Sequence, residues 1–285
     1  MAVYERTYRP YTGGFTAERR RFLVLPRYAY EEVFRSKLFL AFFVVCFIPH
    51  LAGAVLIYLR HNVSALDYLD LQAAQVLPID GSFFFNMMGA EAMFCFLLAL
   101  FVGPALIAPD LRNGALPLYL SRPFTRREYV VGKLAVLALL LSAITWVPLL
   151  LLFSLQASLE DGWLAANARI GWGIVAGSWA WILVLSLIAL AVSAWVKWKP
   201  VARITLLVLF FVLAAFGTML NETLDTTWGS LLNLGELIRA IWAGLLGIDL
   251  RGALAPGAAW AGWAAACAAA LALLARRIKA YEVVR

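Results

Sequence analysis

Apolar residues gather in six long runs along the chain, separated by segments that hold most of the charged residues. A helix needs about 20 mainly apolar residues to cross the hydrocarbon core of a bilayer. Because backbone groups in lipid must find their hydrogen-bond partners within the segment, these runs predict membrane-spanning helices and not strands. The sequence therefore predicts an all-α integral membrane protein with six transmembrane helices, over residues 38–59, 83–108, 134–155, 170–196, 204–220 and 254–275.

The segment before the first run is amphipathic rather than apolar. From Glu18 to Lys37, apolar residues recur every three or four positions, as at Leu25, Ala29 and Val33, and Pro26 predicts a helix start or a kink. This pattern predicts a helix that lies in the membrane interface with its apolar stripe in lipid. It is equally compatible with a docking platform for a partner protein and with a plain membrane anchor. The candidate site residues of this interfacial helix are Arg20, Arg27, Glu31, Glu32 and Arg35.

Two further segments lie between spans on the opposite side. Residues 221–253 are half apolar and interrupted by glycines, so Trp228–Leu234 and Leu237–Ile248 are too short to span. They predict a short re-entrant or interfacial helical pair, and the alternative is a hydrophobic loop packed on the outer ends of the spans. Residues 60–82 predict a polar outer loop with a short helix at Ser64–Gln75.

Composition supports the membrane class, and charge predicts the orientation. Of the 285 residues, 64% are hydrophobic and 14% charged, and the mean hydropathy is +0.83. These values argue against a soluble enzyme, a disordered chain and a nucleic-acid-binding domain. Of the 24 Lys and Arg residues, only Arg60, Arg169, Arg239 and Arg251 lie on one side of the predicted spans. The positive-inside rule therefore places the N-terminal segment 1–37 and the tail 276–285 in the cytoplasm, with the spans in the cell membrane.

The cytoplasmic segment between the second and third spans is dense in helix stops and starts. Pro104 and Pro109 loosen the end of the second span, and Asn113-Gly114 is a helix stop. Thr125 and Glu128 have the spacing of a capping box at the start of the third span. Between these signals, Ala115–Leu120 predicts a short helix that lies across the membrane surface.

The same segment resembles the signature of the permease subunits of ABC-2-type ABC transporters. That signature has an acidic residue, a glycine, a leucine-rich turn, Ser-x-Pro, a basic–acidic pair and Gly-Lys entering the third span. Here the pair Pro109-Asp110 and Ala115 depart from residues common in the family. The matching elements are Asp110, Gly114, Leu116–Leu120, Ser121-Arg122-Pro123, Arg126, Glu128 and Gly132-Lys133.

The resemblance implies a permease that works with a separate ABC ATPase. In this family the interfacial helix and the first cytoplasmic loop contact the ATPase, and two permeases, identical or homologous, assemble with two ATPases to drive export. ATP and magnesium are then expected on the partner, because this chain lacks G-x-x-x-x-G-K-[ST] and carries Arg127 five residues before Gly132. The implied coupling residues are Asp110, Arg112, Gly114, Leu116, Leu120, Arg122, Pro123, Arg126, Arg127 and Glu128.

A few residues within the spans have candidate roles of their own. Glu91 is the acidic residue well inside a span, so it predicts either a substrate path or a pair with another helix, and the alternative is that it reaches water near the outer surface. His50 follows Pro49 and is interpreted as a packing residue at a kink. The sequence predicts no metal site, and Cys46, Cys95 and Cys267 are interpreted as small buried apolar residues.

Small residues predict close helix contacts, and other functions remain possible. Gly173-x-x-x-Gly177 and the stripe Gly257, Ala261, Ala265 and Ala269 suit packing within one subunit or a dimer seam. The alternatives to a permease are a membrane-embedded enzyme, a secondary transporter for a lipophilic substrate and a scaffold that transports nothing. The scarcity of His and of paired carboxylates in the spans argues against the enzyme, and the lack of an internal repeat argues against the secondary transporter.

Overall fold

The computed structural model describes residues 24–62, 78–115, 125–250 and 252–278, and every element in these ranges is a helix. Within them, six helical segments are long and apolar enough to cross a membrane, which confirms the all-α membrane fold. The largest difference in bounds is in the third segment, which begins eight residues before the predicted run. The segments are Lys37–His61, Gly81–Arg112, Arg126–Leu159, Trp163–Trp195, Lys199–Leu224 and Pro256–Arg277.

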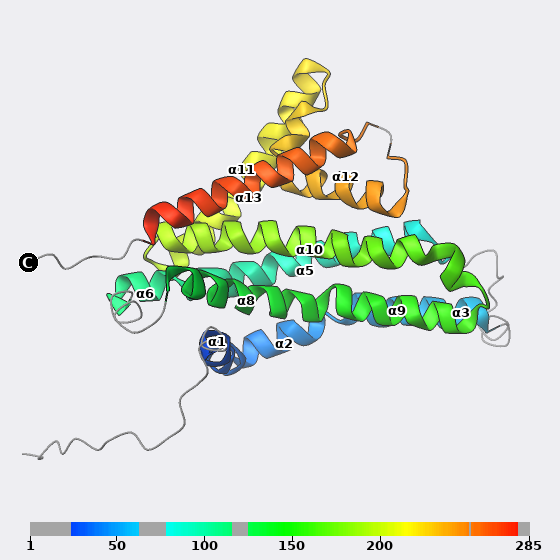
Figure 1. Ribbon diagram of the computed structural model, residues 1–285, viewed down its shortest axis with the longest axis horizontal. Coiled ribbons are helices and arrows are strands. Elements are labelled where there is room, and N and C mark those ends of the chain that lie inside the picture. Colours follow the sequence, from blue (N-terminus) through cyan, green and yellow to red (C-terminus); the bar gives the residue numbers. More distant parts are fainter. Residues whose placement is uncertain (1–23, 63–77, 116–124, 251, 279–285) are drawn as a thin grey trace, which may run out of the picture.

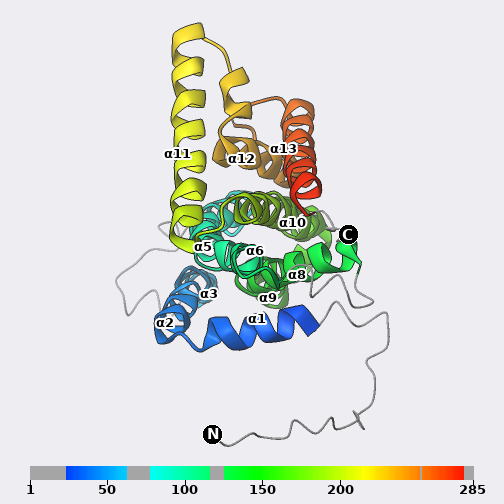
Figure 2. The same cartoon turned by 90° about the vertical axis from the view of Figure 1, so that its left-hand side faces the viewer.

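Two long helices form the centre of the molecule. Helix α5 (Gly81–Leu106) packs against α10 (Trp163–Trp195), and in Figure 1 the two lie side by side with α8 and α9 below them and α12 and α13 above. In contrast, α11 (Lys199–Leu224) stands away from this core in Figure 2, and most of its apolar side chains are exposed. The fifth span therefore has a large apolar surface that the single chain does not cover.

The first and third spans are each broken into two helices. The first consists of α2 (Lys37–Val45) and α3 (Ile48–His61), and the third of α8 (Arg126–Ile144) and α9 (Trp146–Leu159). Pro49 and Pro148 explain both breaks, because proline has no N–H to bond the carbonyl four residues earlier, where α2 and α8 end. The kink at Pro49 agrees with the sequence analysis, and the third predicted span is present but contains a break that we did not predict.

Helix α1 (Val24–Phe34) runs across α8 instead of along the spans. Figure 1 shows it nearly end-on, and Figure 2 shows it from the side, below the spans. Pro26 lies in its first turn, as expected, and residues 18–23 of the predicted amphipathic helix are outside the described ranges. The apolar side chains of Leu25, Ala29 and Val33 pack on the protein core. The expectation that this stripe faces lipid alone is therefore wrong.

The outer segment before the last span forms the predicted helical pair. It contains a 3₁₀ turn, η3 (Trp228–Leu231), and α12 (Leu234–Leu246), which packs on α10 and on α13 (Pro256–Arg277). A Cβ atom at Gly177 would lie 2.6 Å from Cδ1 of Trp242, and one at Gly173 would lie 2.7 Å from Cδ2 of Leu246. The glycine pair of the fourth span therefore serves packing within one subunit.

The other small-residue stripe has no such contact. Gly257, Ala261, Ala265 and Ala269 are all exposed on α13, so a role in a dimer seam stays a prediction. The three cysteines are buried and free, as expected. The predicted outer helix at Ser64–Gln75 lies outside the described residues, which include only 60–62 and 78–82 of the predicted loop.

Candidate functional site

The break between α5 and the short helix α6 (Ala108–Arg112) is held by a serine from α10. The hydroxyl oxygen of Ser193 accepts hydrogen bonds from the N–H groups of Ile107, at 3.1 Å, and Ala108, at 3.0 Å. The same hydroxyl donates to the carbonyl of Pro104 at 3.2 Å. Since Ala108 N–H and Pro104 C=O would bond each other in an unbroken helix, Ser193 replaces that bond and sets the direction of α6.

The redirected α6 brings Asp110 to a mostly buried basic and aromatic pair on α8. Nζ of Lys133 lies 2.8 Å from Oδ2 of Asp110, and the hydroxyl of Tyr129 donates to the same oxygen at 2.7 Å. The Lys133 side chain is buried and its charge is balanced by Asp110, and this ion pair joins α6 to α8.

The start of α8 has the capping box that the sequence predicts. The hydroxyl of Thr125 accepts from the N–H of Glu128 at 3.2 Å, and the Glu128 carboxylate accepts from the N–H of Thr125 at 2.7 Å. Arg126 and Arg127 are exposed beside it, and Gly114 has the expected positive φ of 65°. The predicted short helix is described only at Ala115. The coupling residues Leu116, Leu120, Arg122 and Pro123 lie outside the described residues.

Helix α1 is fixed to α8 by a hydrogen bond from its apolar side. The hydroxyl of Tyr30 donates to the carbonyl of Val136 at 2.8 Å. Burial raises the pKa of Tyr30 from 10.0 to about 12, so the phenol stays protonated and able to donate at any physiological pH. We call the end of the molecule that carries α1, α6 and the first turn of α8 the α1 end.

The charged residues of α1 face outward or toward α11. Arg27 and Glu31 form an exposed i,i+4 ion pair at 3.5 Å, which contributes little to stability. Glu32 lies 3.5 Å from Nζ of Lys199, the first residue of α11. Arg35 is exposed, and Arg20 is outside the described residues. On α6, the Arg112 guanidinium lies 5.2 Å from the ring centre of Trp198, just before α11.

Within the spans, Glu91 pairs with the histidine that follows Pro49. Nε2 of His50 on α3 lies 2.6 Å from Oε1 of Glu91 on α5, and the two side chains are 6% and 3% exposed. The hypothesis that Glu91 pairs with another helix therefore agrees with the structure, and the alternative that it reaches water does not. The interpretation of His50 as a packing residue is incomplete, because its ring contacts a carboxylate.

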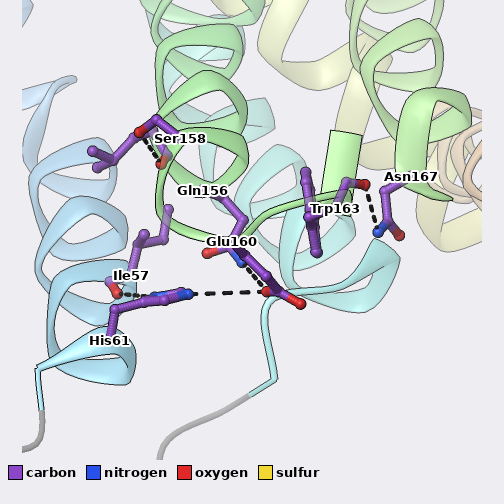
Figure 3. Close-up of polar contacts among 8 residues, drawn as sticks. Ile57, His61, Gln156, Ser158, Glu160, Trp163 and Asn167 are labelled. Atoms are coloured by element: carbon purple, nitrogen blue, oxygen red, sulfur yellow. Dashed lines mark hydrogen bonds and ion pairs between the residues drawn. The ribbon is translucent and has the colours of Figure 1, made fainter. Parts of the chain in front are cut away.

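The second histidine of α3 also faces a carboxylate, at the opposite end of the spans. Figure 3 shows His61 beside the carbonyl of Ile57, with its Nε2 3.9 Å from Oε2 of Glu160 after α9. Gln156 donates to the same Glu160 oxygen at 2.9 Å. Trp163 is buried nearby. Both His–Glu contacts thus join α3 to its neighbouring helices.

Sequence reasoning missed several residues that position the α1 end. Ser193, Tyr30 and Tyr129 carry no local signal, since each acts through a contact with a residue distant in the chain. His50 did carry a local signal in the sequence, because an imidazole in an apolar run needs a polar partner. In the described ranges, no group of three or more His, Cys, Asp or Glu residues could hold a metal ion.

Comparison with known proteins gives one match over most of the chain. The model of a family described as "ABC-2 family transporter protein" matches residues 30–278. No curated protein matches the chain significantly. The matched range includes the C-terminal part of α1, from Tyr30 to Phe34, and all of the described helices that follow it.

Proposed function

Since the chain belongs to the ABC-2 transporter family, as one of its membrane-spanning permeases, we propose that its α1 end transmits ATP-driven movement from a separate ATPase to the spans. Two copies of the ATPase, with ATP and magnesium bound to them, would act on two permeases, this chain and an identical or homologous one. The transport direction that we propose is export across the cell membrane, with both termini in the cytoplasm.

The observation that supports coupling is the way in which short helices are tied to the long ones. Helix α6 is joined to α10 through Ser193 and to α8 through Asp110 and Lys133, and α1 is joined to α8 through Tyr30. A force applied to α1 or α6 therefore reaches α8 and α10 through buried hydrogen bonds and an ion pair. Where packed helices can adopt two arrangements, connections of this kind can convert a small displacement into a shear between helices.

The exposed basic residues of the α1 end are the surface we propose for the ATPase. Arg126 and Arg127 are exposed beside the capping box, and Arg112 is exposed on α6. Glu128 has a different role, because its carboxylate caps the start of α8. Replacing Glu128 would disturb the helix end itself, so a test of docking has to leave it unchanged.

The proposal is tested by co-purification of the permease from its own cells, with mass spectrometry to identify any ABC ATPase that is recovered with it. The double variant R126Q/R127Q removes two exposed charges and leaves the capping box in place. A matched control is K197Q/R276Q, which removes two exposed charges elsewhere at the same end of the spans. We expect the ATPase to be lost from the first variant and kept by the second. Equal recovery with both variants would contradict the assignment of this surface.

We also propose that the His50–Glu91 pair supports the transport path. An ionisable pair in the middle of a span is expensive unless it has a structural or transport role. The variant E91Q keeps the size of the side chain and removes its charge. We expect E91Q to assemble with the ATPase and to transport less. Transport at the wild-type rate would remove the pair from the mechanism.

A further inference from the structure

A cavity of about 500 Å³ lies at the α1 end, between α1, α5, α6, α8 and α11. Much of its wall is apolar, from Val33 of α1, Phe39 of α2 and Phe101 of α5. The remainder of the wall is charged. The charged side chains that line it are Glu32, Asp110, Lys133, Lys199 and Arg203.

The cations of this cavity outnumber its carboxylates, and one cation is left over. Asp110 is paired with Lys133, and Glu32 lies beside Lys199. Arg203 has no acidic partner in the part of the chain that the structure describes. One of its terminal nitrogens donates to the carbonyl of Phe101 at 3.2 Å, and its buried Nε has no partner there. The guanidinium lies 5.6 Å from the ring centre of Phe101, which holds it against the cavity wall.

The start of α11 is unfavourable without an anion. Lys199 and Arg203 are separated by one turn, and like charges at this spacing destabilise a helix. Lys199 lies in the first turn, where the helix dipole also disfavours cations, and Arg203 follows it at the start of the second turn. Trp198, at the N-cap position, provides no side-chain hydrogen bond to the first N–H groups. A bound anion would offset the repulsion between the two cations, interact favourably with the helix dipole and accept hydrogen bonds from the first N–H groups.

We propose that the cavity binds the phosphate group of an anionic phospholipid from the leaflet beside α1. Arg203 and Lys199 hold the phosphate oxygens, as charge-assisted donors do. The glycerol and the upper acyl chain lie against Phe39 and Phe101, which belong to spans. Apolar walls directly beside the cations favour an amphiphile over a free anion. The bound lipid joins α11, which has few buried contacts of its own, to α1 and α5.

The test uses the full chain, purified in a neutral detergent, and measures its melting temperature as lipid is added. The additions are phosphatidylglycerol, phosphatidylcholine with the same acyl chains, and inorganic phosphate. The variants are R203Q and, as a matched control, R276Q, which removes an exposed cation at the same end and outside the cavity. Native mass spectrometry of each variant counts the lipids that remain bound.

We expect phosphatidylglycerol to raise the melting temperature of the wild type and of R276Q more than the other additions do. The loss of the charge-assisted bonds in R203Q should weaken the apparent affinity about tenfold. R203K keeps the charge without the planar fork and should bind with intermediate affinity. If R203Q does not fold, K199Q provides the same comparison at a half-buried position of the cavity wall. Equal stabilisation of R203Q and wild type, or equal effects of phosphatidylglycerol and inorganic phosphate, would overturn the proposal.

Discussion

Replacing Ser193 with alanine tests whether the break between α5 and α6 is held from α10. The substitution removes one hydroxyl, which accepts from the N–H groups of Ile107 and Ala108 and donates to the carbonyl of Pro104. Ser193, Ile107 and Ala108 are all buried, with exposures of 0%. Water therefore cannot replace the missing partner without a local rearrangement.

The expected effect follows from the groups that are left unpaired. A buried polar group without a partner costs about 1–3 kcal/mol. With two N–H groups affected, we expect S193A to lower the free energy of unfolding by about 2–4 kcal/mol. Partial recovery is possible if α5 and α6 straighten, which would move Asp110 away from Lys133. A straightened helix would therefore weaken coupling to the ATPase as well as stability.

The chain provides a close control for this variant on the same helix. Ser186 is also 0% exposed, about two turns earlier on α10, and its hydroxyl has no partner among the described residues. S186A removes the same atom from the same kind of environment and should leave stability unchanged or slightly higher. Unfolding in mixed micelles of detergent and SDS measures both variants. Equal destabilisation by S193A and S186A would refute the role that we assign to Ser193.

Three other contacts give predictions of the same kind. Y30F should lower the stability of the α1–α8 contact by about 1 kcal/mol, measured by proteolysis within α1. Because burial raises the pKa of Tyr30 from 10.0 to about 12, the difference in stability from wild type should be full below pH 10 and disappear as the pH rises through 12. A difference that disappears near pH 8 would contradict this prediction. H50A should lower the free energy of unfolding by about 3 kcal/mol because it leaves Glu91 buried and unpaired. A double-mutant cycle of H50A and E91Q should show a coupling energy between the two side chains, whereas additive effects would argue against the pair. G177A should lower the free energy of unfolding by about 1–3 kcal/mol, because its new Cβ atom would contact Trp242. At Gly257 an added Cβ atom would have no neighbour within 4 Å, so G257A should leave stability unchanged. The melting temperatures of the two variants test this difference.

The sequence predicts the elements of this fold well because they depend on local patterns. Hydropathy alone locates the six spans, and the spacing of Thr125 and Glu128 predicts the capping box that forms. Pro148 carries the same signal as Pro49, so the break in the third span could have been predicted too. Glycines at 173 and 177 predict a close approach but not the partner, since α12 comes from a segment far along the chain.

The candidate site is harder to predict, because its residues are assembled by tertiary contacts. Asp110 is found through its motif, but its pairing with the buried Lys133 depends on how Ser193 directs α6. Glu91 and His50 are each conspicuous as polar residues in apolar runs, and only the packing of α3 on α5 brings them to 2.6 Å. The low burial of α11 also has no sequence signal, because its hydropathy equals that of the central helices.

The most direct test of the coupling proposal is photo-crosslinking in intact cells, with a photoreactive residue placed at Arg126. The account predicts a crosslink to a polypeptide that carries the motif G-x-x-x-x-G-K-[ST], identified by mass spectrometry. A photoreactive residue at Trp228, which is exposed at the opposite end of α11, should give no such product. No ATPase crosslink from Arg126, or equal yields from both positions, would contradict the claim that the α1 end contacts a nucleotide-hydrolysing partner.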